Sequence, residues 1–387
     1  MSTSAPLRLL AVGHSYVLAT NRAILRELAR DESFDISVAA PAYFHGDLRP
    51  LTLEPEPAGS RLTIVPLRAY LTRSVHVFAY HPADLRRVVS NGGYDVVHAW
   101  EEPYILGGYQ IASALRGSPA RFCFRTAQNN VKRYPPPFGH FEGAVLARAQ
   151  RWIAGGQLVY DAMCSKGFPA ETGTVLTLSV DTTEFTPSTA ESRAMAKRAM
   201  GLTGPVIGYL GRFTKPKGIP LLLQAMDIVG MGRPWTLLLL GSGPLEDSIH
   251  RWAAKRGIAE RVRVQLVRHD EVSGVLPAMD VMVAPSQTAP NWREQFGRMS
   301  IEAFAAGVPL IASDSGEIPT VAGDAAIIVP ERDAHGFASA ICRLLDSPDD
   351  CAELVRRGYL RAERYSSRQL ARQFAEFYRE LASTRCS

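Results

Sequence analysis

Short apolar runs alternate with segments whose apolar residues recur at helical spacing, and this alternation continues along most of the chain. In the second half, the pattern predicts strands at residues 205–210, 235–240, 262–266, 280–284, 308–312 and 325–329, with helices at 219–229, up to about 256 and after Gly297. In the first half, it predicts strands at 7–12, 36–39, 62–66, 94–98 and 121–125, with helices at 21–30, 82–90 and 104–115. Such alternation is typical of α/β domains with mostly parallel sheets covered by helices on both faces.

A polar segment that ends in Pro187 and Ser188 predicts the boundary between two domains, at 1–185 and 186–365. The tail, residues 366–387, carries Leu370, Phe374, Phe377 and Leu381 at helical spacing, so it predicts an amphipathic helix that covers another surface. Two stretches rich in Pro and Gly, 41–60 and 132–140, predict long loops on the acceptor side of a site.

The composition is that of a soluble globular protein, because 46% of the 387 residues are hydrophobic and 21% are charged. No apolar stretch is long enough to span a bilayer, and Met1–Pro6 lacks the basic start and apolar core of a secretory signal. We therefore expect a cytoplasmic protein. The five cysteines, with Cys386 the last, are widely spaced and form no C-x-x-C pair, which argues against a disulfide framework or a cysteine metal site.

Positive charge is concentrated in the N-terminal half. The net charge is +5, and the segment from Arg61 to Lys166 holds 13 Lys and Arg against 6 Asp and Glu. Such a face suits phosphates or anionic lipid, and an ordinary solvated surface explains it equally well. No recognition module accompanies the charge, so we expect no nucleic-acid partner.

Glu294 and Glu302 stand eight positions apart, with Gly297 between them and an Ala-rich helical segment after it. The glycine suggests a loop that lets backbone approach a ligand, and the start of the helix favours an anion. Taken alone, the two acids also fit the carboxylate pair of a glycosidase. Glu302 lies four residues after Arg298, so a surface ion pair between these two is a further alternative.

A second candidate segment, residues 211–218, follows a predicted strand and opens a helix. Its Arg212 and Lys217 suit the negative charge of a diphosphate, whereas a turn with solvated charges is the alternative. Gly241 begins the glycine-rich turn Gly-Ser-Gly-Pro after the next strand, which fits either close approach to a phosphate or base, or a simple tight turn. The spacing of a P-loop is absent, and no downstream acid completes a dinucleotide fingerprint.

These motifs together resemble the retaining glycosyltransferases of family 4, over nearly the whole chain. Glu294 and Glu302 match E-x7-E, Gly211 to Gly218 matches G-R-x-x-x-x-K-G, and Gly241 begins G-x-G-P. The resemblance implies a GT-B fold of two Rossmann-like domains with the active site in the interdomain cleft. The N-terminal domain would face the acceptor, the C-terminal domain would bind the nucleotide sugar, and the last helix would pack back on the N-terminal domain.

The implied reaction moves a sugar from a nucleotide-diphosphate sugar to a hydroxyl acceptor with retained configuration, in polysaccharide or glycoconjugate biosynthesis. The acceptor would be a glycan, a lipid-linked compound or a small-molecule glycoside. The resemblance implies no metal and no cofactor beyond the donor, and a donor phosphate oxygen would take the proton of the acceptor. A glycosidase is disfavoured, because it has no diphosphate leaving group for Arg212 and Lys217 to stabilise.

The resemblance also implies roles for individual residues. Arg212 and Lys217 would stabilise the departing diphosphate, and Glu294 would position the sugar. Glu302 would bind the ribose. The cradle around the donor would be completed by backbone groups at Gly211, Gly241, Phe296, Gly297 and Arg298.

In the N-terminal half the match to the family is weaker. Gly13 occupies the place of a glycine-rich loop that meets the diphosphate, and it is the one glycine there. His98 begins a segment similar to the family's H-x-H motif, but Trp100 replaces the second histidine, so His98 is either catalytic or structural. This departure keeps open a non-catalytic nucleotide-sugar-binding protein of GT-B fold. The positive charge of the N-terminal half is compatible with a lipid-linked acceptor and with a peripheral contact at the inner face of the membrane.

Overall fold

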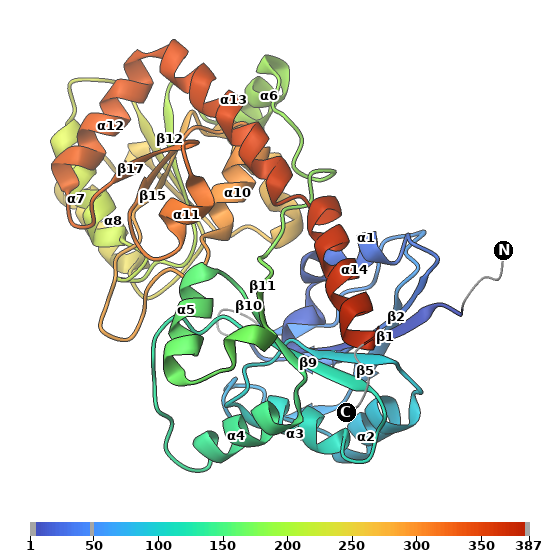
Figure 1. Ribbon diagram of the computed structural model, residues 1–387. Helices are drawn as coiled ribbons and strands as arrows, with labels where there is room; N and C mark the ends of the chain where they lie inside the picture. Colours follow the sequence, from blue (N-terminus) through green and yellow to red (C-terminus); the bar gives the residue numbers. More distant parts are fainter. Residues whose placement is uncertain (1–4, 47–49, 384–387) are drawn as a thin grey trace. The chain divides into compact units, whose positions relative to one another are not determined.

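The computed structural model describes residues 5–46 and 50–383, so Cys386 and the first four residues lie outside it (Figure 1). The chain folds into two compact units. Unit 1 comprises Met1–Thr177 with Ser367–Ser387, and unit 2 comprises Leu178–Ser366. The division thus falls after Thr177, whereas the sequence placed the boundary at 185/186. Each unit is built around its own parallel sheet, as the alternation of strands and helices predicts.

The sheet of unit 1 has seven parallel strands in the order β11-β10-β9-β8-β1-β2-β5. Their bounds are β1 Leu7–Val12, β2 Phe34–Pro41, β5 Thr63–Leu67, β8 Val96–Ala99, β9 Arg121–Thr126, β10 Arg151–Ala154 and β11 Gly173–Val175. From β1 the chain first adds strands on one side and then, beginning with β8, on the other. The strand order therefore reverses between β1 and β8.

Helices α1 Ala23–Leu28, α2 Pro82–Asn91, α3 Leu106–Ala114, α4 Phe138–Arg148 and α5 Gln157–Lys166 lie between these strands in the sequence. The last helix of the chain, α14 Ser367–Ser383, also belongs to unit 1. The sequence pattern missed β10, β11, α4 and α5, and the expected loop at 132–140 is wrong after residue 137 because α4 begins at Phe138. The stretch 41–60 holds the short antiparallel hairpin of β3 (Tyr43–Phe44) and β4 (Leu51–Thr52). A second short hairpin joins β6 (Ala69–Tyr70) to β7 (Ala79–Tyr80).

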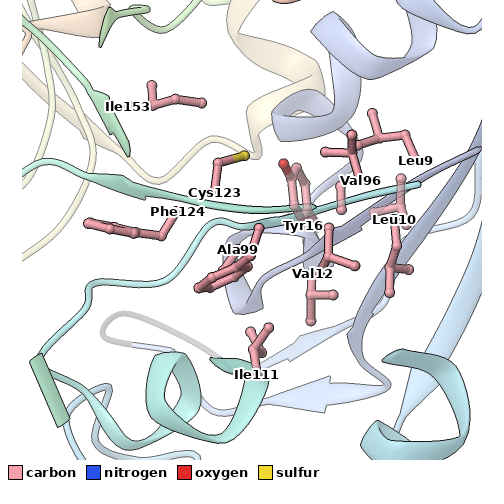
Figure 2. Packing of buried hydrophobic residues seen from close by; sticks show 14 of the residues in the cluster. Leu9, Leu10, Val12, Tyr16, Val96, Ala99, Ile111, Cys123, Phe124 and Ile153 are labelled. Atoms are coloured by element: carbon pink, nitrogen blue, oxygen red, sulfur yellow. The ribbon is translucent and has the colours of Figure 1, made fainter. Parts of the chain in front are cut away.

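The core of unit 1 lies along the central strands, which are apolar on both faces because helices cover both sides (Figure 2). The tail helix α14 completes this core. It packs against α1 and β8, and its predicted apolar stripe is buried, with Leu370, Phe374, Phe377 and Leu381 all at 3% exposure or less (Figure 1). An isolated helix of this length is marginal in water, so packing of the stripe supplies its stability.

His98 of β8 lies under α14 and takes part in this packing. Its side chain is 1% exposed, and Nδ1 lies 2.8 Å from the Tyr378 hydroxyl. Burial, and then the positive charge of Arg125, lower the pKa of His98 from 6.5 to about 3. The imidazole is therefore neutral near pH 7.

The sheet of unit 2 has six parallel strands in the order β14-β13-β12-β15-β16-β17. Their bounds are β12 Val206–Leu210, β13 Thr236–Leu240, β14 Val262–Gln265, β15 Val281–Ala284, β16 Leu310–Ser313 and β17 Ala326–Val329. All six were predicted to within two residues at each end. The strand order reverses between β12 and β15, as it does between β1 and β8 in unit 1.

Alternate residues of the unit 2 strands contribute to two separate hydrophobic cores. One core takes Ile207, Leu237 and Val281 and includes residues of α7 (Ile219–Val229), α8 (Glu246–Lys255) and α12 (Ala334–Asp346). The other takes Val206, Leu238 and Met282 and includes residues of α6 (Ala190–Ala199), α10 (Arg298–Ala305), α11 (Ile318–Ala322) and α13 (Pro348–Arg364), with the short α9 (Val272–Val275). The sheet is thus covered on both faces. No helix within residues 5–46 and 50–383 is both long and apolar enough to cross a membrane.

Glycines allow the loops at the carboxyl ends of these strands to touch backbone to backbone. Gly218 has φ 77°, and a Cβ there would lie 1.7 Å from the carbonyl oxygen of Pro285. A Cβ on Gly316, with φ 57°, would lie 2.0 Å from the Glu294 carbonyl oxygen. Because only glycine tolerates both the left-handed backbone and the missing space, these positions fix the loops after β12, β15 and β16 against one another.

Gly218→Ala is expected to destabilise unit 2 much more than Gly201→Ala. Gly201 has a similar φ of 62° but nothing within 4 Å of its would-be Cβ, so its substitution measures the backbone cost alone, about 1 kcal/mol. The clash with Pro285 should add about 1–3 kcal/mol at position 218. Urea unfolding of both variants measures the difference, and equal midpoints would show that the loops are not packed as described.

His98→Gln is expected to flatten the acid side of the stability curve. The unfolded chain takes up a proton near pH 6.5, whereas folded His98 does not until about pH 3, so the parent loses folding free energy as pH falls between these values. By pH 5 this loss amounts to about 2 kcal/mol relative to the variant. Denaturant unfolding at pH 7 and pH 5 measures it, and parallel losses in the two proteins would place His98 in contact with solvent.

Candidate functional site

The loops that follow β12 and β15 bring together two of the residues singled out from the sequence. The ammonium Nζ of Lys217 lies 2.6 Å from Oε2 of Glu294, although the two residues are 77 positions apart. Their side chains are 16% and 8% exposed. The pair stands where the strand order of unit 2 reverses, and such crevices at the carboxyl ends of parallel strands are the common ligand sites of α/β sheets.

Further side chains hold this pair in place. Ser286 donates a hydrogen bond of 3.0 Å to the same oxygen of Glu294, and the Trp292 ring lies 5.0 Å from Lys217 Nζ. Sequence reasoning missed both residues, although each lies within eight positions of Glu294 on the loop after β15. The carboxylate therefore has a fixed orientation, with a cation and a hydroxyl on one oxygen.

The backbone of Glu294 is fixed as well. The N–H of Glu317 donates to the Glu294 carbonyl oxygen at 3.1 Å, at the loop where Gly316 allows close approach. The N–H of Gln287 donates to the Pro216 carbonyl oxygen at 2.7 Å and so ties the loop after β15 to the loop that carries Lys217. Three strand-end loops thus form one hydrogen-bonded unit around the pair.

Arg212 shares the loop with Lys217, and its side chain is exposed. Its carbonyl oxygen accepts a hydrogen bond of 2.8 Å from the buried Tyr209 hydroxyl, which anchors the start of the loop. Burial, followed by the negative charge of Glu294, raises the pKa of Tyr209, so this hydroxyl keeps its proton. The arginine is therefore held at its backbone, and its guanidinium group has the charge and the geometry to bind an anion.

Packing between two loops is enough to explain why residue 241 is a glycine. A Cβ there would lie 2.0 Å from the Gly211 carbonyl oxygen, so the glycine is needed for contact between the loops after β12 and β13. The Phe213 N–H donates to the Ser242 carbonyl oxygen at 2.8 Å and reinforces this contact. Gly211 and Gly241 therefore shape the loop that carries Arg212.

Helix α10 begins directly after Gly297, which adopts the left-handed conformation with φ 77°. Phe296 is 4% exposed and packs edge-on against Tyr365, with ring centroids 5.6 Å apart, so its side chain belongs to the core. Arg298 opens the helix and is half-buried. Only the backbone at Phe296 remains for the donor contact that the sequence predicted.

Glu302 lies inside α10 at 9% exposure, so it does not lie on the surface as the ion-pair alternative assumed. Burial raises the pKa of Glu302, the Arg298 charge lowers it, and Glu184 raises it further. Hydrogen bonds donated by ligand hydroxyls would favour the ionised form of a carboxyl group in such surroundings.

In unit 1, the structure gives Gly13 and His98 packing roles. Gly13 is extended, and a Cβ there would lie 2.8 Å from the Trp100 carbonyl oxygen. His98 is buried under α14, away from any ligand-accessible surface. Trp100, at the second position of the H-x-H pattern, packs edge-on against Tyr16 at 5.0 Å and under Arg125 at 4.8 Å.

Within the part of the chain that the structure describes, no three or more His, Cys, Asp or Glu residues are grouped to hold a metal ion. Arg212 and Lys217 offer positive charge, and Glu294 and Glu302 offer hydrogen-bond acceptors. This combination fits a ligand that carries both phosphates and hydroxyl groups.

Comparison with known proteins identifies a matching family and similar proteins. Residues 191–361 match the family described as glycosyl transferases group 1. A D-inositol 3-phosphate glycosyltransferase of Corynebacterium urealyticum is 31% identical over 54% of this chain and 51% of its own length. A 2-deoxystreptamine glucosyltransferase of Streptomyces kanamyceticus is 27% identical over 76% of each chain. The chain spans about half the length of most of the curated relatives it matches.

The crystal structure of Anabaena Alr3699/HepE in complex with UDP-glucose superposes with a TM-score of 0.73 at 16% identity, covering 97% of this chain and 100% of that chain. This likeness establishes the fold of both units. The chain therefore has the GT-B fold and carries, at residues 191–361, a domain of the glycosyl transferases group 1 family.

Proposed function

We propose that this protein is a glycosyltransferase that moves a sugar from a nucleotide-diphosphate sugar to a hydroxyl acceptor and retains the anomeric configuration. The observation that carries the proposal is the Lys217–Glu294 pair, 2.6 Å apart at the reversal point of the unit 2 sheet, with Arg212 on the same loop. A site for a nucleotide sugar needs positive charge for the diphosphate and carboxylates for the sugar and ribose hydroxyls.

The role of each side chain follows from its charge. Arg212 and Lys217 stabilise the negative charge that grows on the diphosphate as the bond to the sugar breaks, so that no metal is assigned this task. Glu294 accepts hydrogen bonds from sugar hydroxyls and holds the reacting carbon in position. Glu302 accepts hydrogen bonds from the ribose, and backbone groups at the start of α10 face the donor.

The comparisons guide the choice of substrates for testing. Because the Anabaena neighbour was crystallised with UDP-glucose, that nucleotide sugar is the first donor to test. The names of the two relatives suggest inositol phosphate and 2-deoxystreptamine as acceptors. A lipid-linked acceptor, with a contact between the basic N-terminal half and anionic lipid, stays a prediction and belongs in the same panel.

A non-catalytic nucleotide-sugar-binding protein is the second candidate. The observation in its favour is that His98 is buried and Trp100 replaces the second histidine of the H-x-H pattern. The two candidates differ in one measurement, since a transferase releases nucleoside diphosphate when it is incubated with donor and acceptor. The melting temperature of a binding protein rises when the nucleotide sugar is added, but no nucleoside diphosphate is released.

Lys217→Ala and Glu294→Ala are each expected to lower the rate of transfer by about 10²–10³-fold, because each removes a group aimed at the transition state. The measurement is nucleoside diphosphate release, with circular dichroism to verify the fold. Full activity in either variant would contradict the assignment of this site.

Lys215→Ala is the matched control. It lies on the same loop, its side chain is exposed, and its substitution removes the same charge. We expect a loss of less than about threefold, since an exposed charge that does not contact the donor acts only through screened long-range attraction. A loss as large as that of Lys217→Ala would indicate a general effect of loop charge.

A further inference from the structure

Unit 2 contains a pocket of about 620 Å³ at the amino ends of its strands. The pocket lies between α6, α13 and the residues that precede β12 and β15, such as Pro205 and Asp280 (Figure 1). Lys217 and Glu294 follow the carboxyl ends of these same two strands, so this α6–α13 pocket is separate from the candidate donor site. Its volume falls within the range of small-molecule sites, about 300–1,000 Å³.

One wall of the α6–α13 pocket carries two cations on one carboxylate. Lys197 Nζ lies 2.6 Å from Oδ2 of Asp280, and Arg193 Nη2 lies 3.1 Å from Oδ1. The three side chains are 22–28% exposed. They are the charged residues among those that line the pocket, so the lining has a net charge of +1.

The two cations keep hydrogen-bond donors that the protein does not use. Lys197 Nζ donates to Asp280 and, at 2.9 Å, to the Gly204 carbonyl oxygen, which leaves one of its three hydrogens. Arg193 donates through Nη2 alone, to Asp280 and to the Met279 carbonyl oxygen. Its Nε and Nη1 have no hydrogen-bond partner among the residues that the structure describes. Asp280 also accepts the Val206 N–H at 2.7 Å, so this carboxylate is already occupied.

The Arg193 guanidinium faces into the pocket. Burial raises the pKa of the Cys351 thiol and of the Tyr359 hydroxyl, and the positive charge of Arg193 opposes the rise in both. Cys351 and Tyr359 line the pocket from α13, whereas Arg193 belongs to α6. The arginine therefore projects from α6 toward the wall that α13 forms.

The wall formed by α12 and α13 is mainly apolar. Leu344 and Leu345 contribute to it from the end of α12, and Val355 contributes from α13. The Cys351 thiol donates to the Leu344 carbonyl oxygen at 3.1 Å and adds no charge. Asp350, the neighbour of Cys351, is paired with Arg343 at 2.7 Å. A ligand that matches both walls has an anionic group at α6 and an apolar body against α12 and α13.

We propose that the α6–α13 pocket binds a monocarboxylate with an apolar body. Its carboxylate accepts hydrogen bonds from Arg193 and Lys197, and its apolar part lies against Leu344, Leu345 and Val355. A single negative charge balances the net charge of +1, and the planar donors of arginine match the two oxygens of a carboxylate. This site does not rest on the proposed function, because none of its residues belongs to the donor site.

Octanoate is the probe for this site, and two analogues are its matched controls. Octan-1-ol keeps the chain without the charge, and acetate keeps the charge without the chain. We expect calorimetry to show one octanoate per chain, bound at least about tenfold more tightly than either control and unaffected by UDP-glucose. A lack of saturable octanoate binding, equal affinity for either control, or displacement by UDP-glucose would each overturn the proposal.

Two variants test the two walls. Arg193→Gln removes a positive charge, and Ala352→Glu adds a carboxylate at an exposed lining position of α13. Each is expected to weaken octanoate binding at least about tenfold. The matched controls make the same charge changes outside the pocket, at exposed positions, namely Arg198→Gln on α6 and Leu360→Glu on α13, and should bind as the parent does.

Because Arg193 also ties α6 to Asp280, Arg193→Gln alone could lose binding through loss of the fold. Ala352→Glu removes no hydrogen bond, and circular dichroism verifies its fold. Parent-like octanoate affinity in folded Ala352→Glu would overturn the placement of the ligand.

Thiol labelling locates the bound octanoate independently. Cys351 lines the pocket, whereas Cys342, also partly exposed, does not. Octanoate should slow the reaction of Cys351 with N-ethylmaleimide, mapped by mass spectrometry, and leave that of Cys342 unchanged. Protection of both cysteines or of neither would contradict binding in this pocket.

Discussion

The reversal of strand order in each parallel sheet is the constraint on which the candidate sites depend. Where strands are added in one direction, the loops at their carboxyl ends cross to the same side and cover one another. At the reversal, the loops of two neighbouring strands lead to opposite faces and leave a crevice between them. In unit 2 the loops at the reversal carry Lys217 and Glu294, and in unit 1 they carry His14 and Glu101, with His14 Nδ1 2.5 Å from Glu101 Oε2.

A crevice positions chemistry only if its loops are rigid. In unit 2 the rigidity comes from backbone contacts that exclude every side chain larger than hydrogen, at Gly218, Gly241 and Gly316. These contacts cost conformational entropy, because glycine loses more freedom on folding than other residues. The loops gain backbone hydrogen bonds in return, including that from Glu317 to Glu294. The same glycines therefore explain both the turn motifs in the sequence and the fixed orientation of the site.

The sequence predicts the features that depend on neighbouring residues, but it does not predict contacts between residues that lie far apart in the chain. All six strands of the unit 2 sheet were predictable, because an apolar run and the residues that end it are adjacent in the sequence. Lys217 and Glu294 were selected from the spacing of their motifs. The burial of His98 was not predictable, because the helix that covers it begins more than 260 residues later. The His14–Glu101 pair was visible only as two polar residues after two strands, and joining them requires the strand order.

The Lys217–Glu294 pair explains how two charged groups are held in a poorly exposed position. A carboxylate at 8% exposure without a partner would carry a large desolvation cost, and the ammonium and the Ser286 hydroxyl offset it. On the proposed function, a diphosphate competes with Glu294 for Lys217, and sugar hydroxyls then replace the ammonium on the carboxylate. Each partner exchanges one hydrogen bond for another, so the donor binds without leaving a buried charge unpaired. On the proposed function, the ion pair therefore holds both groups where the donor needs them.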